Sequence, residues 1–412
     1  MKILMVNKFY YIKGGSETYY FSLKKLLEKM GHTVVDFSMK DEKNEYSLYS
    51  DYFVENKDYN SSSSIVSKVK MGIDIIYSKE AKSKFKELVI QEKPDIVHLH
   101  IFQHQISPSI LDVCKKYDIP TIYTAHDLKM ICPNYKMMHH SKVCEECKNG
   151  HFYNCVKNKC VKDSYSKSLV NFIEGYFHKY KKTYDVIDYI LTPSHFYKKK
   201  FIQFGVNSDK VIHLPNFLEQ EDDSFNLNEV NKNYYLYFGR LSEEKGIITL
   251  IKAVEKLNVT LYVVGTGPLK EEIDNYIITN SINNVKMLGF KSGNELKEIV
   301  RNSKAIILPS EWYENGPYSA IESLQLSRPI IGANIGGIPE LIDGNGLIFE
   351  SGSVHSLKES ISKFESFNSE EIEQLEKKSK EIYQLNYVGS LHYEKIIEVM
   401  KLAISKHNNK LL

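Results

Sequence analysis

The feature that most constrains this 412-residue sequence is an alternation between short apolar runs and longer amphipathic stretches. The runs have the length of strands, and the stretches between them carry apolar residues at helical spacing. The predicted strands are 2–6, 32–37, 96–100, 121–124 and 189–192 in the first half, and 234–238, 261–264, 285–288, 305–308 and 329–332 in the second. Strands that alternate with helices predict parallel sheets covered on both faces.

Because the alternation occurs twice, the predicted fold class is α/β, with two Rossmann-like domains that face each other across a cleft. The N-terminal domain would span 1–215 and the C-terminal domain 234–388, joined by a polar, acidic linker at 216–233. Segment 389–412 is predicted to close the fold, either as an ordinary amphipathic helix or as one that crosses back to the first domain. Ligands of such sheets bind outside the carboxyl ends of the strands, so the cleft is the expected site.

The charge balance excludes one class of protein. The sequence has 54 basic and 52 acidic residues, a formal net charge of +2, which does not suit a nucleic-acid binder driven by its global charge. No apolar stretch approaches 18 residues, and only four consecutive apolar residues stand near the start. We therefore expect neither a signal peptide nor a membrane-spanning helix. The expected location is the cytoplasm, including the inner face of the cell membrane.

A first candidate binding segment follows the predicted strand 234–238. Gly239 and Gly246 let the backbone approach a ligand, while Arg240 and Lys245 bring two cations to the carboxyl edge of the sheet. A guanidinium fork and a point charge suit a diphosphate, and a helix that starts near Gly246 adds its positive end. The alternative is a solvated loop with ordinary charges.

A second candidate segment runs from Glu314 to Glu322, after the predicted strand 305–308. Carboxylates accept two hydrogen bonds each, which suits sugar hydroxyls, and the backbone amides at 316–319 would meet a phosphate at the start of a helix. Two solvated glutamates are the alternative. A third segment, 336–340, repeats the order of strand, glycine turn and helix start, and it could be turn chemistry alone.

Taken together, these segments resemble a known family. The resemblance rests on the motifs Gly239-Arg240…Lys245-Gly246, Val263-Val264-Gly265-x-Gly267-Pro268, Gly289-Phe290, Pro309-Ser310, Glu314-x7-Glu322, Gly336-Gly337-x-Pro339-Glu340, Gly14-Gly15-x-Glu17, His126-Asp127 and Thr192-Pro193-Ser194. In their order, they resemble the family-4 retaining glycosyltransferases of the GT-B fold over nearly the whole chain. One position departs from the pattern, because Asn315 stands where many members carry an aromatic residue.

The resemblance implies roles for individual residues. Arg240 and Lys245 would hold the donor diphosphate, Glu322 the ribose hydroxyls and Glu314 the donor sugar. His126 would reach the donor sugar from the N-terminal, acceptor-binding domain, first as a positioning residue and second as a general base. The implied catalytic residues are His126, Arg240, Lys245 and Glu314. The implied donor-binding residues are Gly14, Gly15, Gly239, Gly265, Phe290, Asn315, Gly316, Pro317, Tyr318 and Glu322.

The activity implied is a hexosyltransferase-like transfer from a nucleotide-diphosphate sugar to a glycan or lipid-linked acceptor. The anomeric configuration would be retained, the pathway would be cell-surface polysaccharide synthesis, and no metal would be needed for catalysis. A nucleotide-sugar epimerase of the same fold is one alternative. A nicotinamide-dependent dehydrogenase is weakened because Lys270 stands at the third glycine position of Gly-x-Gly-x-x-Gly. A zinc-knuckle binding protein is disfavoured by the charge balance.

Five of the six cysteines lie between 132 and 160. The spacing Cys144-x2-Cys147-x7-Cys155-x4-Cys160 suits a tetrahedral structural zinc site, with Cys132 just upstream. Free reduced thiols and disulfides are the alternatives. Because this insertion follows His126-Asp127, we expect it to shape an acceptor-side loop.

Two segments, 166–182 and 197–201, mix aromatic residues with lysines. Basic amphipathic helices can rest on an anionic membrane, which would suit a lipid-linked acceptor. The alternative is a helix packed on the core, with its lysines in solvent.

Overall fold

The computed structural model describes residues 1–57, 65–219 and 233–409, and the chain forms two compact units. The first unit comprises Met1–His139, Cys144–Leu214 and Ser390–Leu412, and the second His140–Val143 and Pro215–Gly389. The predicted linker 216–233 lies largely outside the described residues. Its described start belongs to the second unit, where Leu218 forms a parallel bridge with Val388.

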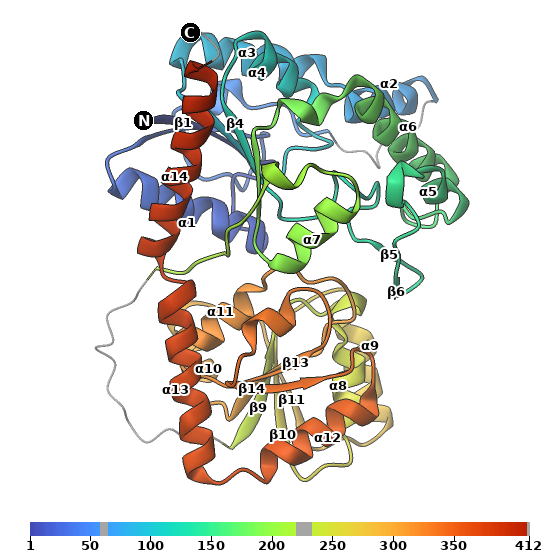
Figure 1. Cartoon of the computed structure of the whole chain (residues 1–412). Helices are drawn as coiled ribbons and strands as arrows, with labels where there is room; N and C mark the ends of the chain where they lie inside the picture. Colours follow the sequence, from blue (N-terminus) through green and yellow to red (C-terminus); the bar gives the residue numbers. More distant parts are fainter. Residues whose placement is uncertain (58–64, 220–232, 410–412) are drawn as a thin grey trace. The chain divides into compact units, whose positions relative to one another are not determined.

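The first unit is built on a six-stranded sheet in which every pairing is parallel (Figure 1). The strands, in spatial order, are β2 (Thr33–Phe37), β1 (Lys2–Val6), β3 (Ile96–Leu99), β4 (Thr121–Thr124), β7 (Tyr189–Thr192) and β8 (Val211–His213). This is the flavodoxin-like order with a sixth strand added, and its order reverses between β1 and β3. The central strands β3 and β4 are buried along their whole length, as expected for a sheet covered on both faces.

Eight α-helices and five short 3-10 helices of the described chain surround this sheet. The α-helices are α1 (Gly15–Lys29), α2 (Ile65–Ile76), α3 (Lys79–Glu92), α4 (Leu111–Lys116), α5 (Tyr153–Lys157), α6 (Tyr165–Lys181), α7 (His195–Gln203) and α14 (Gly389–Asn408). The 3-10 helices are η1 (Ser50–Tyr52), η2 (Pro108–Ile110), η3 (Lys148–Gly150), η4 (Thr183–Val186) and η5 (Ser208–Lys210).

Helix α14 returns the end of the chain to the first unit, where it lies beside α1 (Figure 1). Its side chains make polar contacts along much of its length. The Tyr19 hydroxyl lies 2.9 Å from His392 Nε2, and the Tyr393 hydroxyl lies 2.8 Å from His32 Nε2. Near the other end, His407 Nε2 lies 3.0 Å from the Asp188 carboxylate. The last helix is thus an integral part of the first unit.

The second unit also has a six-stranded, all-parallel sheet. The strands, in spatial order, are β11 (Val285–Gly289), β10 (Thr260–Val264), β9 (Tyr234–Phe238), β12 (Ala305–Leu308), β13 (Ile330–Ala333) and β14 (Gly346–Phe349). This is the Rossmann order, which reverses between β9 and β12. The helices are α8 (Ile247–Val254), α9 (Lys270–Thr279), α10 (Gly293–Arg301), α11 (Tyr318–Gln325), α12 (Val354–Glu365), α13 (Ser369–Asn386), η6 (Glu243–Lys245) and η7 (Ile338–Leu341).

Alternating side chains build two cores in the second unit, one on each face of its sheet. Tyr235 and Tyr237 of β9 pack with α8 and α12 on one face. Leu236 and Phe238 pack with α10, α11 and α13 on the other (Figure 1). The alternation follows from the period of two along a strand. Strand β9 is therefore fixed from both sides, and the loop that follows it starts from a rigid point.

The predicted α/β fold class with two Rossmann-like domains is confirmed. All ten predicted strands are present, with ends that differ by no more than two residues. Strands β8 and β14 were not predicted, because β8 is three residues long and β14 begins at a glycine and is only half-buried. The two-residue strands β5 (Met138–His139) and β6 (Lys142–Val143) also lacked a sequence signal.

None of the described helices is both long enough and apolar enough to pass through a bilayer.

Candidate active site

The carboxyl ends of the strands in the second unit place most of the predicted site residues along one edge of its sheet. Arg240 follows β9, Gly265 follows β10 and Phe290 follows β11. Glu314 follows β12 beside them, and Gly336 follows β13. Arg240 and Glu314 therefore flank the point where the strand order reverses, which is where doubly wound sheets bind their ligands.

Lys245 and Glu314 meet at this edge although they lie 69 residues apart in the chain. Lys245 Nζ lies 2.6 Å from Glu314 Oε1, and the ammonium also stands 5.3 Å from the centre of the Trp312 ring. The Ser310 hydroxyl donates a second hydrogen bond to Glu314 Oε1, at 2.7 Å. Glu314 is buried, so its carboxylate is held by a charge-assisted pair and a hydroxyl rather than by water.

Two of the loops need glycine because the backbone of another segment lies too close to leave room for a side chain. Gly246 has a φ of +65°, and a Cβ atom there would lie 1.9 Å from the Pro309 carbonyl oxygen. Gly336 has a φ of +60°, and a Cβ atom there would lie 2.4 Å from the Glu314 backbone nitrogen. The Gly337 N–H also donates to the Glu314 carbonyl oxygen at 2.7 Å. The three sequence segments that we singled out therefore pack against one another.

Arg240 is exposed, in contrast to Glu314. Its backbone carbonyl accepts a hydrogen bond from the Tyr237 hydroxyl at 2.7 Å, which fixes the loop while leaving the guanidinium at the surface. Phe290 is also exposed, and Gly239 and Gly265 lie at the ends of the neighbouring strands β9 and β10. The edge thus offers an exposed cation, Arg240, beside a cation and a carboxylate that hold each other, Lys245 and Glu314.

Helix α11 begins at Tyr318, directly after the loop that carries Glu314. Pro317 stands at its N-cap with an extended backbone and no side-chain hydrogen bond to the first turn. Asn216 donates to the Gly316 carbonyl at 2.8 Å, which fixes the loop beside Asn315. Glu322 lies in the second turn of the helix and is partly buried. The helix therefore presents its N-terminal amides beside the loop of Glu314.

His126 belongs to the first unit, together with Gly14 and Gly15. It follows β4 and lies in a cluster of imidazoles that the sequence interpretation did not foresee. His100 Nδ1 lies 3.1 Å from His126 Nε2, and His98 Nε2 lies 2.8 Å from the Thr124 hydroxyl. The Tyr19 ring meets His126 edge-on, with 5.1 Å between ring centres. The one signal in the sequence was the pair His98-x-His100 at a strand end.

Burial keeps this cluster uncharged. It lowers the pKa of His126 to about 3, and it lowers the pKa values of His98 and His100 well below their usual range. Next to them, burial raises the pKa of Asp127 to about 6 and lowers that of Lys8 to about 8. His126 is thus a neutral hydrogen-bonding group at neutral pH, and Lys8 is a further cation near the end of β1 that the sequence interpretation missed.

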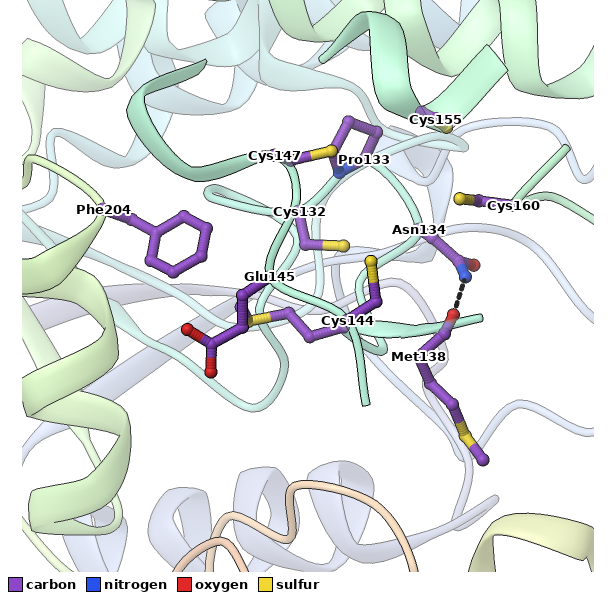
Figure 2. Close-up of a pocket in the computed structure, with 11 residues that line it drawn as sticks. Cys132, Pro133, Asn134, Met138, Cys144, Glu145, Cys147, Cys155, Cys160 and Phe204 are labelled. Carbon is purple, nitrogen blue, oxygen red and sulfur yellow. Dashed lines mark hydrogen bonds between the residues drawn. The ribbon is translucent and has the colours of Figure 1, made fainter. Parts of the chain in front are cut away.

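The predicted cysteine site also lies in the first unit. Cys144, Cys147, Cys155 and Cys160 line one small pocket, and Cys132 joins them (Figure 2). Each is a free thiol, so the disulfide alternative is not realised. Burial raises the pKa of Cys132 to about 11, and Cys155 raises that of Cys160 through a hydrogen bond.

Proximity alone does not make this pocket a metal centre. Within the described residues, no group of three or more His, Cys, Asp or Glu side chains is arranged to hold a metal ion. Structural zinc therefore stays a prediction, with Cys132 as a fifth candidate ligand. Metal analysis of the purified chain tests it, since one zinc per chain would support the site and a content near zero would remove it.

Comparisons with known proteins identify the family. The family model described as Glycosyltransferase Family 4 matches residues 13–222, and the model described as Glycosyl transferases group 1 matches residues 219–382. The first match alone covers half of the chain. The chain belongs to glycosyltransferase family 4. This membership leaves the dehydrogenase and zinc-knuckle alternatives without support.

Individual relatives agree with this assignment. An uncharacterized glycosyltransferase of Methanocaldococcus jannaschii is 32% identical over 207 residues, which are 50% of this chain and 56% of that protein. An uncharacterized 42.6 kDa protein in the cps region of Klebsiella pneumoniae is 24% identical, over 83% of this chain and 87% of that protein. The chain thus spans only about half of the first relative.

Among solved structures, HepE of Anabaena in complex with UDP and glucose shares the fold. The two chains have a TM-score of 0.66 at 16% identity, over 97% of this chain and 99% of that one.

Proposed function

We propose that the protein is a retaining glycosyltransferase that moves a sugar, hexose-like in size, from a nucleotide-diphosphate donor to a glycan or lipid-linked acceptor. The observation that carries this proposal is the meeting of Lys245, Glu314 and the Gly336 turn at the reversal point of the Rossmann-type sheet. Membership of the family supports glycosyl transfer, and the cps-region relative supports a role in polysaccharide synthesis.

Stabilisation of the leaving group is the main task of such a site. When the bond between the sugar and the diphosphate breaks, negative charge grows on the diphosphate. Arg240 and Lys245 are the cations available at this edge, and the first amides of α11 add partial positive charge. Lys245 is held in place by Glu314 before the donor arrives, so little reorganisation is needed.

The two glutamates suit hydroxyl groups. Glu322 on α11 would accept hydrogen bonds from the ribose, and Glu314 would accept from the donor sugar while it keeps its contact with Lys245. A complex of the Anabaena neighbour with UDP and glucose supports a uridine nucleotide as the first donor class to try.

His126 would act as a neutral hydrogen-bonding partner rather than as a charged acid. With a pKa of about 3, it is not an imidazolium acid at neutral pH, and the neutral ring donates one hydrogen bond from its N–H nitrogen and accepts one at the other nitrogen. We therefore assign it to positioning of the sugar, with retention of the anomeric configuration drawn from the resemblance alone.

The experiment is a transfer assay with a panel of nucleotide sugars and candidate acceptors, in which the anomer of the product is read by NMR. We expect one donor to be consumed only when acceptor is present, with retained configuration. Conversion of the donor to its epimer without acceptor would favour the epimerase instead, and an inverted product would refute retention.

A further inference from the structure

Helix α6 in the first unit has its polar face inward and its apolar face outward. Five large apolar side chains, spaced three or four residues apart, are between 39% and 80% exposed: Tyr165, Leu169, Ile173, Phe177 and Tyr180. Residues at this spacing lie on one side of a helix. Single exposed apolar residues are common, but a continuous stripe along a helix marks an interaction surface.

The residues on the inward face explain why α6 packs with its polar side toward the unit. Its buried residues are Ser168, Asn171, Glu174 and His178. Glu174 pairs with Lys129 at 2.7 Å, and Asn171 donates to the Pro133 carbonyl at 3.0 Å. Polar contacts inside the unit, the buried pair of Glu174 and Lys129 above all, therefore fix the helix and leave its apolar stripe exposed.

The exposed charges on the helix itself are basic, although Lys181 pairs with Asp112 of α4 at 2.7 Å and the exposed Asp163 lies just before the helix. Along α6 and the residue after it, the exposed charged side chains are Lys167, Lys179, Lys181 and Lys182. The acid of this segment is Glu174, which is buried and paired with Lys129. A second copy of the chain would bring the same lysines against these, whereas an anionic surface complements them.

Tyrosines stand at both ends of the stripe. Tyr165 opens the helix and Tyr180 lies next to its last residue. Tyrosine combines an apolar ring with a polar hydroxyl and favours the boundary between lipid and water. A helix of this length, roughly 25 Å, could lie flat on a bilayer with a tyrosine at each end.

We infer that α6 docks the first unit on an anionic lipid bilayer, with its stripe among the acyl chains and its lysines at the headgroups. The other segment that the sequence suggested, 197–201, does not take part through its aromatic residues. Tyr197 and Phe201 of α7 are buried, and of the three lysines between them only Lys199 is exposed, while Lys200 pairs with Glu145.

Vesicle cosedimentation of the full chain tests this inference without using the proposed activity. The probes are phosphatidylcholine vesicles with and without phosphatidylglycerol. We expect the double variant Leu169→Ser/Ile173→Ser to lower the partition coefficient on anionic vesicles by about tenfold or more. The matched control, Ile90→Ser/Ile278→Ser, changes isoleucines of α3 and α9 that are 49% and 74% exposed and should leave it within about twofold.

A second pair of substitutions separates charge from apolar contact. Lys167→Gln/Lys179→Gln should lower binding to anionic vesicles by about fivefold per lysine and leave binding to neutral vesicles unchanged. Absence of wild-type binding to anionic vesicles, or equal binding by all three variants, would overturn the inference. The inference would also be overturned if the wild type were a dimer that does not bind vesicles and Leu169→Ser/Ile173→Ser were a monomer. The stripe would then be the contact between two copies of the chain.

Discussion

The two sheets of this protein share an architecture but differ in the side chains at their carboxyl edges, where the second sheet has an ion pair and the first a cluster of neutral histidines. At the edge of the second sheet, Arg240, Lys245 and Glu314 are charged, and two of them form an ion pair. Near the carboxyl edge of the first, His100 and His126 are held uncharged by burial. The charged edge therefore suits a phosphate, and the histidine cluster suits a neutral molecule that bears hydroxyl groups.

The largest effect is expected at the charged edge. Lys245→Gln keeps a donor for Glu314 but removes the cation that would face the diphosphate, so kcat/KM of transfer should fall by about 10²–10³-fold. Steady-state kinetics with the donor identified in the panel assay measure it. The control is Lys252→Gln, which changes an exposed lysine of α8 and should leave kcat/KM unchanged. Equal activity in Lys245→Gln and Lys252→Gln would contradict the charged site.

The neutral histidine cluster of the first sheet predicts that the free energy of unfolding falls in acid. Because the folded-state pKa of His126 is about 3 and an unfolded histidine titrates near 6.5, the unfolded state binds more protons between these values. Stability is therefore fully present above about pH 6.5 and is lost as pH falls, by about 2 kcal/mol for this residue at pH 5.

Urea denaturation at pH 7 and pH 5 measures this loss. His126→Gln should lose about 2 kcal/mol less than the wild type over that interval, and the exposed His355→Gln should behave as the wild type does. If His126 were instead charged in the folded state, all three proteins would lose the same free energy of unfolding between pH 7 and pH 5.

The smallest effect concerns the last helix. Tyr19→Phe removes the hydroxyl that bonds His392 but keeps the ring that contacts His126, so the free energy of unfolding should fall by about 1 kcal/mol. A double-mutant cycle with His392→Ala isolates the pair. A coupling energy of zero would mean that the contact between Tyr19 and His392 does not link α14 to the histidine cluster.

Sequence patterns predicted ten of the twelve strands in the two large sheets and most of the charged edge, because glycine turns and charged residues follow the strands directly. They could not foretell the histidine cluster, since Tyr19 and His392 are 373 residues apart and only tertiary packing joins them. Nor could periodicity tell which face of α6 turns inward. A buried pair such as Lys129 and Glu174 reverses the usual orientation, and it becomes visible only in the folded chain.

The direct test of the charged edge is calorimetric titration of the wild-type chain, Lys245→Gln and Lys252→Gln with UDP and GDP. We predict that one of these nucleotides binds the wild type and Lys252→Gln alike and that Lys245→Gln raises its Kd by about tenfold or more. If neither nucleotide binds the wild type, or if Lys245→Gln binds as tightly as the wild type does, the edge of the second sheet is not the diphosphate site.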